Sequence, residues 1–155
     1  MQILGEKGLG NILKVILQIF LCIVSLVLIA LPFVLQIFGL NLGASIFIIY
    51  PNGIVLLLIA NKFMKLFDSL KNNKPFCENN VKILKSTGKT AFIGACFWMM
   101  DLLYEIVFAE KLDVICILVM TFLFILYIGV SIALYILSEL FKQATEYKNE
   151  NELTI

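Results

Sequence analysis

The sequence predicts an all-α integral membrane protein whose four transmembrane helices form a bundle. The apolar fraction is 61% and the charged fraction only 15%, whereas soluble domains are nearer half apolar and a quarter charged. The apolar residues gather in four runs of roughly 20 residues, and each run is long enough to cross about 30 Å of hydrocarbon. A chain of 155 residues has the length of one domain, so residues 1–155 are expected to form a single transmembrane domain.

The four expected spans cover residues 13–35, 43–63, 89–109 and 114–137. The first run is too long for the apolar region of a cleaved signal peptide, and no A-x-A site follows it. The second span contains the segment YPNG at residues 50–53, and the third contains Asp101 and Glu105. Polar positions of this kind are tolerated in a bilayer only where they face protein or water.

The lysines predict the orientation of the chain. It has no arginine, and of its 12 basic residues only Lys111 lies between the third and fourth spans. The other eleven lie before the first span, after the fourth, or around the loop between the second and third. By the positive-inside rule, both termini and this loop are cytoplasmic. The expected location is therefore the cell (plasma) membrane, with a multi-pass topology.

The cytoplasmic loop, residues 64–88, is expected to be helical and basic. An apolar stripe extends the second span as a helix until the segment KNNKP, where paired asparagines and Pro75 interrupt it. A new helix is expected to begin with Cys77 at the N-cap and Glu78 in the first turn. Phe76 and Val81 have the spacing of a hydrophobic staple. The loop is either a helical hairpin at the inner membrane surface, with its lysines near lipid phosphates, or a docking surface for a cytoplasmic partner.

The cytoplasmic tail, residues 138–155, is expected to continue the fourth helix and then lose its periodicity. An apolar stripe runs through Leu137, Leu140, Phe141, Ala144 and Tyr147. The final segment KNENELTI has no such pattern. This end either frays in solvent, or its last residues make a contact with the loop or with a partner. The candidate contact residues are Leu153, Thr154 and Ile155.

The residue types present argue against catalytic and metal chemistry. The chain has no histidine, which is the commonest general base and metal ligand. Cys22, Cys96 and Cys116 lie within expected spans and only Cys77 lies in the loop, so no C-x-x-C pair is formed. We therefore expect no enzyme activity, no catalytic residues, no cofactor and no bound metal.

The loop resembles a known signature. Its segment PFCENNVKILKSTGK carries the matching positions Pro75, Phe76, Glu78, Asn80, Leu84, Lys85 and Gly88. This pattern is similar to the YoaS-like family, a group of small bacterial four-span membrane proteins whose domain has no known function. The Glu- and Asn-rich end that closes in Leu-Thr-Ile is also similar. Cys77 and Thr87 depart from the family pattern, where a Ser or Thr cap and an apolar residue are common.

The resemblance implies a partner. Members of that family are commonly encoded beside a very small Cro/Xre-type helix-turn-helix protein, which implies a membrane protein that acts with a DNA-binding regulator. The expected docking residues are those of the signature, Pro75, Phe76, Glu78, Asn80, Leu84 and Lys85, and the terminal Leu153, Thr154 and Ile155. This chain has no nucleic-acid-binding motif, so direct binding to nucleic acid is not expected.

The polar residues within the spans predict a buried layer. Counted from Lys89, Asp101 lies about 18 Å into the bilayer, and Glu105 lies near the outer interface. An ionised carboxylate at the depth of Asp101 costs a few kcal/mol, so we expect it to face the helices and to be neutral much of the time. Ser25, Asn52 and Thr121 come to the same level on the other spans. The layer either joins the helices through hydrogen bonds, or acts as a protonation or ligand switch.

Three functions remain open at this point, in order of preference. The first is a non-enzymatic regulatory or sensor membrane protein that holds a small helix-turn-helix partner. The second is a structural or self-immunity membrane protein whose polar residues only join helices. The third is an oligomeric ion- or proton-coupled transporter that uses Asp101. Small multidrug exporters also have four spans and a membrane carboxylate, but their motifs are absent from the sequence and the long basic loop does not fit them.

Overall fold

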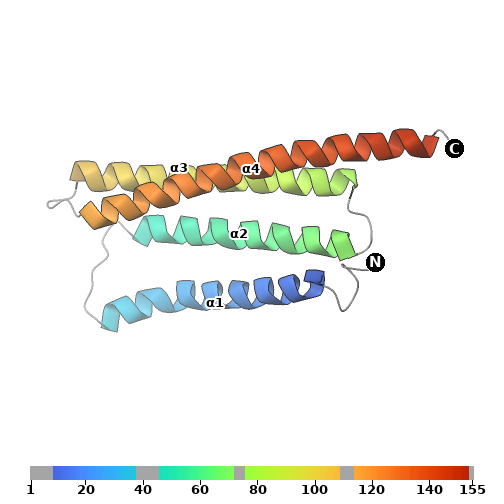
Figure 1. Ribbon diagram of the computed structural model, residues 1–155. Coiled ribbons are helices and arrows are strands. Elements are labelled where there is room, and N and C mark those ends of the chain that lie inside the picture. Colours follow the sequence, from blue (N-terminus) through green and yellow to red (C-terminus); the bar gives the residue numbers. More distant parts are fainter. Residues whose placement is uncertain (1–8, 38–45, 72–75, 109–113, 154–155) are drawn as a thin grey trace.

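The computed structural model describes residues 9–37, 46–71, 76–108 and 114–153. Within these residues the chain forms helices α1 (Leu9–Ile37), α2 (Ile46–Lys71), α3 (Glu78–Phe108) and α4 (Val114–Leu153). The prediction of an all-α protein is therefore confirmed. The helices run up and down, so that the start of α1, the end of α2, the start of α3 and the end of α4 lie at one end of the molecule (Figure 1). We refer to it as the polar end.

Among the described residues, three helices are long and apolar enough to cross a membrane. They are α1 over Asn11–Val34, α3 over Glu78–Phe108 and α4 over Val114–Glu150. Within α2 the described side chains run from Tyr50 to Ser69, a stretch that contains the polar segment at residues 50–53 and two lysines. The described part of α2 therefore does not reach the same apolarity, and the second expected span stays a prediction.

The helices pack mainly in chain order. Helix α3 lies between α2 and α4 and contacts both extensively, while α1 makes its main contacts with α2. No residue in the apolar stretch of α1 is buried within the protein, and Lys14 near its start forms an ion pair with Asp68 of α2. A compact four-helix bundle is therefore not confirmed. The best-packed part of the described structure is the α3–α4 pair.

Close approach of backbones explains the tight packing of α3 on α4. The Ser131 hydroxyl donates a hydrogen bond of 2.9 Å to the carbonyl oxygen of Gly88. A Cβ atom on Gly88 would lie only 3.2 Å from the Ser131 carbonyl oxygen. Small residues at a helix interface permit this approach, which is the main source of helix association in lipid. We call the contact of Gly88 with Ser131 and Leu134 the α3–α4 seam.

The buried polar residues of α4 repeat every seven positions. Ser131, Ser138 and Thr145 are all buried, and they face α3 because α3 is the main neighbour of α4. The apolar stripe predicted on this segment is largely exposed, with Leu140 at 55% and Tyr147 at 67%. Membrane proteins place small and polar side chains between helices because lipid already solvates the apolar ones.

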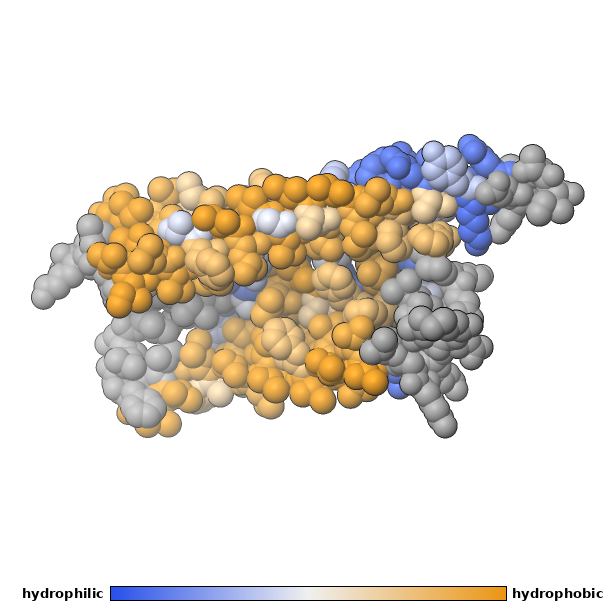
Figure 2. All heavy atoms as spheres, in the orientation of Figure 1, coloured by the Kyte–Doolittle hydropathy of each residue, from blue (hydrophilic) through white to orange (hydrophobic). Residues whose placement is uncertain are grey.

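The surface of the molecule is apolar over most of its length. Figure 2 shows hydrophobic side chains along the helices, with hydrophilic ones gathered where α4 extends past the other helices. Large exposed apolar residues occur on α1, α3 and α4, for example Leu26 at 66%, Phe92 at 55% and Ile115 at 73%. Apolar surface on this scale is expected where lipid is the solvent, and it supports the assignment to a membrane.

Candidate functional site

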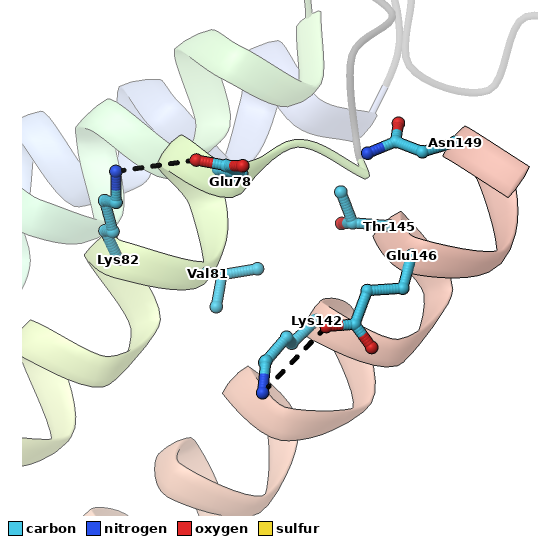
Figure 3. A pocket seen from close by; sticks show the side chains of 7 residues that line it. All are labelled: Glu78, Val81, Lys82, Lys142, Thr145, Glu146 and Asn149. Atoms are coloured by element: carbon cyan, nitrogen blue, oxygen red, sulfur yellow. Dashed lines mark ion pairs between the residues drawn. The ribbon is translucent and has the colours of Figure 1, made fainter.

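A groove opens at the polar end between the start of α3 and the end of α4 (Figure 3). Its volume is about 220 Å³. Helix α3 supplies Glu78, Val81 and Lys82, and α4 supplies Lys142, Thr145, Glu146 and Asn149. We call it the polar groove. Charged side chains from both helices therefore surround a single apolar residue, Val81.

The charges of the polar groove are paired within each helix. Lys82 lies 3.6 Å from Glu78, and Lys142 lies 3.5 Å from Glu139 and 3.9 Å from Glu146. All of these side chains are more than half exposed. Exposed pairs of this kind contribute about 0.3–0.5 kcal/mol each, so the charges remain available to a partner of either sign.

Local sequence explains why α3 begins at this place. The Cys77 carbonyl accepts the backbone N–H groups of Asn80 at 3.0 Å and Val81 at 3.4 Å, so Cys77 stands directly before the first turn, as predicted. Glu78 follows in that turn, where a negative charge favours the helix dipole. The Phe76 ring packs against Phe141 of α4, with ring centroids 5.5 Å apart. The entry to α3 is therefore fastened to α4.

Three of the signature residues, Asn80, Leu84 and Gly88, are buried. Asn80 is 0% exposed and Leu84 is 1% exposed. Leu84 forms a core cluster with Leu66 of α2 and Leu134 of α4, and Gly88 lies in the α3–α4 seam. These positions hold three helices together, so they do not belong to an exposed docking surface in this conformation. A sequence pattern does not tell which of its residues pack in the core and which bind a partner. The exposed fraction of each side chain separates the two roles.

The other predicted docking residues are exposed or lie outside the described residues. Phe76 is 41% exposed and Glu78 is exposed. The Lys85 ammonium lies over the ring of Tyr135, 5.6 Å from its centroid. Leu153 is the last residue of α4, and nothing is described of its side chain. Pro75, Thr154 and Ile155 lie outside the described residues.

Two members of the expected polar layer are buried, and the other two bond within their own helices. Asp101 and Asn52 are buried. Ser25 donates to the carbonyl of Leu21 in its own helix, and Thr121 donates to the carbonyl of Ile117 in its own helix, both at 2.8 Å. Among the described residues no hydrogen bond to the Asp101 carboxyl is formed. Two of the four residues are therefore buried, on α2 and α3, and the hydrogen-bonded layer stays a prediction.

A small cavity lies near this level of the helices. Its volume is about 200 Å³, and all four helices line it through Leu28, Asn52, Gly53, Leu56, Trp98 and Tyr127. Sequence reasoning did not find Trp98 and Tyr127. A usable signal was the single tryptophan of the chain, which lies four residues after Gly94 and so faces the same side of α3. The ring of Tyr127 covers Gly94, because a Cβ there would lie 2.5 Å from Tyr127 Cε1.

A lysine of α2 is also held inside the polar end. The Lys62 ammonium donates to the Ser86 carbonyl at 3.0 Å and to the Ser86 hydroxyl at 2.8 Å, and it also donates to Thr90. Hydroxyl and carbonyl oxygens of α3 thus accept hydrogen bonds from this partly buried ammonium. Among the residues that the structure describes, no group of three His, Cys, Asp or Glu side chains is placed to hold a metal ion.

The chain matches one family model, described as a protein of unknown function, DUF2975, over residues 20–155. The match covers most of α1 and all of α2, α3 and α4, and the chain belongs to this family. No curated protein and no solved structure matches it.

Proposed function

We propose that this member of the DUF2975 family is a non-enzymatic regulatory membrane protein that binds a small helix-turn-helix protein at the polar end. The observation that carries the proposal is the exposed apolar stripe on the end of α4. Leu137, Leu140, Ala144 and Tyr147 follow one another at three- and four-residue steps, and Leu140 and Tyr147 are more than half exposed. We call them the α4 stripe.

The position of the α4 stripe supports a protein partner. Helix α4 extends past the other helices at the polar end (Figure 1), where its surroundings are hydrophilic (Figure 2). Another face of this segment is already packed, since Ser138 and Thr145 are buried and Phe141 contacts the Phe76 ring before α3. An amphipathic helix with one face fixed and one apolar face exposed is a common way to recognise another helix.

The charge distribution supports placing the polar end in the cytoplasm of a bacterial cell. Lys14, Lys62, Lys85, Lys89 and Lys142 all lie on helix segments at this end. An excess of lysine marks the cytoplasmic side of a membrane protein. A DNA-binding regulator is present only on that side of the membrane, so a cytoplasmic polar end is consistent with this partner.

Binding measurements on two matched variants test the proposal. The partner probe is the small helix-turn-helix protein encoded nearest to this gene, purified and added to the full-length protein in detergent. The double substitution Leu140→Gln with Tyr147→Gln removes the apolar side chains and is expected to weaken binding at least about tenfold, since interface anchors of this size contribute about 1 kcal/mol or more each. The control, Gln143→Ala with Glu150→Gln, changes two exposed residues of the same helix.

The two variants give distinguishable outcomes. The proposal is supported if the stripe variant loses binding while the control binds like the wild type. Equal binding by all three proteins, or no binding by the wild type, overturns it. The substitutions in both variants are at exposed positions and are expected to leave the fold intact. Circular dichroism on each variant checks that α4 is still helical.

A second candidate function is a proton- or ion-coupled transporter, and the burial of Asp101 favours it over a purely structural role. Asp101 is 7% exposed on a helix long and apolar enough to cross a membrane, and an ionisable residue in that position is a candidate for proton or ion transfer. Reconstituted vesicles test this candidate through pH-driven proton flux. Flux that is lost in Asp101→Asn supports it, and the absence of flux in the wild type excludes it.

A further inference from the structure

A second groove lies between α3 and α4, farther along both helices from the polar end than the polar groove. It is lined by Lys89, Phe92 and Ile93 of α3 and by Ser131 and Tyr135 of α4, and its volume is about 370 Å³. We call it the lateral groove. Phe92, Ile93 and Tyr135 are between 45% and 55% exposed, so its walls are apolar and open to the surroundings of the protein. A neighbouring hollow of about 450 Å³ continues it along α4 and shares Ser131 and Tyr135.

Positive charge is concentrated at one end of the lateral groove. Lys89 lines it, and Lys85 stands one turn nearer the polar end with its ammonium 5.6 Å from the centroid of the Tyr135 ring. Among the described residues neither lysine forms an ion pair with a carboxylate. Glu139 lines the neighbouring hollow, but Lys142 lies 3.5 Å from its carboxylate. The mouth of the groove therefore has two cations that no neighbouring carboxylate neutralises.

The groove has little else to offer a polar ligand. The Ser131 hydroxyl already donates its hydrogen to the Gly88 carbonyl. The remaining side chains, Phe92, Ile93 and the ring of Tyr135, have no donor or acceptor along the groove except the tyrosine hydroxyl. A peptide strand bound there would leave its backbone groups without partners, which costs several kcal/mol in an apolar environment. A second copy of the chain would bring lysines against lysines.

We propose that the lateral groove binds one anionic phospholipid of the leaflet at the polar end. An acyl chain lies along Phe92 and Ile93, and the headgroup phosphate lies between Lys85 and Lys89. The depth of the groove in the membrane suits a lipid. Lys89 lies at the expected membrane boundary, beside the lipid headgroups, and Phe92 and Ile93 follow it into the span, beside the acyl chains. With the polar end in the cytoplasm, this leaflet is the one rich in anionic lipid. The site is independent of the helix-turn-helix partner and stands whether or not that partner binds.

The first experiment counts bound lipids on the full-length protein by native mass spectrometry. The protein in non-ionic detergent is titrated with phosphatidylglycerol or with phosphatidylcholine of the same acyl chains. We expect phosphatidylglycerol to bind at least about fivefold more tightly, because each lysine near a lipid phosphate contributes a favourable electrostatic interaction. Equal affinity for the two lipids would overturn the proposal.

Matched lysine variants separate a defined site from general attraction to positive charge. Lys85→Gln with Lys89→Gln is expected to lower phosphatidylglycerol affinity about tenfold and to leave phosphatidylcholine affinity unchanged. Lys65→Gln with Lys82→Gln removes the same charge from two other exposed positions at the polar end and is expected to change affinity less than about twofold. A similar loss in both variants would mean that only the net charge matters, and the proposal would fail.

Two further experiments test whether an acyl chain occupies the groove and whether the bound phosphate belongs to a lipid. Ile93→Trp fills the groove and is expected to weaken both lipids, and phosphatidylcholine binding that is unaffected would show that no chain lies there. Circular dichroism must show the wild-type helix content for this variant to count, and the lysine variants decide the matter if it does not. Inorganic phosphate at millimolar concentration is expected not to displace phosphatidylglycerol. Displacement would show that the lysines bind free phosphate, which refutes a lipid site.

Discussion

The close contact at Gly88 leads to a quantitative prediction about the α3–α4 seam. In Gly88→Ala the new Cβ would stand 3.2 Å from the Ser131 carbonyl oxygen and 3.5 Å from Leu134 Cβ. The first of these atoms belongs to a helical backbone, which cannot rotate away as a side chain can. Overpacking of this kind typically costs about 1–3 kcal/mol. Replacing glycine by alanine inside a helix returns about 0.8–1 kcal/mol, so the net effect ranges from near zero to a loss of about 2 kcal/mol.

A control within the same protein removes this uncertainty. Gly129 lies in the interior of α4, and a Cβ there would meet nothing within 4 Å. Gly129→Ala therefore receives the same gain in helix propensity without the contact. The difference between the two variants isolates the seam, and we expect Gly88→Ala to be less stable than Gly129→Ala by about 1–3 kcal/mol.

The free energy of unfolding is measured by titrating the full-length protein from mild detergent into sodium dodecyl sulfate. Circular dichroism reports helix content, and the single tryptophan, Trp98 on α3, reports tertiary packing. Gly88→Leu extends the series and is expected to lose more than the alanine variant. If Gly88→Ala and Gly129→Ala are equally stable, α3 and α4 do not approach as closely as described and the seam is wrong.

Three further measurements test other parts of the molecule. Asp101→Leu is expected to be at least as stable as the wild type in the same titration, since no described residue bonds to the carboxyl, and a loss of about 1 kcal/mol would restore its role in joining helices. Cys77 is expected to react with an impermeant thiol reagent only after the cytoplasmic side is opened, and labelling in intact cells would reverse the orientation. Trp98 lies about 13 Å beyond Lys89, so lipids brominated in mid-chain are expected to quench its fluorescence more than lipids brominated at the headgroup. The opposite order would place α3 outside the bilayer core.

Composition and run length were sufficient to predict the helices, because a long apolar run with few charges has few alternatives to a helix in a membrane. The start of α3 also follows from local sequence, since Cys77 and Glu78 stand directly before it and in its first turn. Local capping preferences act over one or two turns and need no knowledge of the partner helix. These features were therefore within reach of the sequence alone.

Composition and run length did not predict which face of each helix packs against its neighbours. The apolar stripe on the end of α4 is evident in the sequence, yet Leu140 and Tyr147 are exposed while Ser138 and Thr145 are buried. Apolar periodicity identifies the inner face of a helix in water, and in lipid the inner face is marked by small and polar residues instead. The seven-residue spacing of Ser131, Ser138 and Thr145 was available in the sequence and carried that information.

The candidate site shows the same division between packing and binding. The signature includes residues that fill the core, such as Asn80 and Leu84, beside exposed ones such as Phe76. Both kinds of position belong to the signature, and a single sequence does not show which of them are buried. Trp98 and Tyr127 were missed for a related reason. Aromatic residues do not stand out from the other apolar residues of a span until the cavity between the helices is known.

The unequal packing of the helices restricts how any signal at Asp101 can reach the polar end. Helix α3 carries Asp101 near one end and the polar groove at the other, about 35 Å away at 1.5 Å per residue. Sliding α3 along α4 would break the hydrogen bond from Ser131 to Gly88 and bring the Gly88 backbone against larger side chains. Helix α1 contacts mainly α2, where Leu28 packs on Gly53, and none of the residues in its apolar stretch is buried. A rearrangement driven from Asp101 would therefore move α3 and α4 together past the less tightly packed α1, and it would carry the α4 stripe and the lateral groove with it as one body.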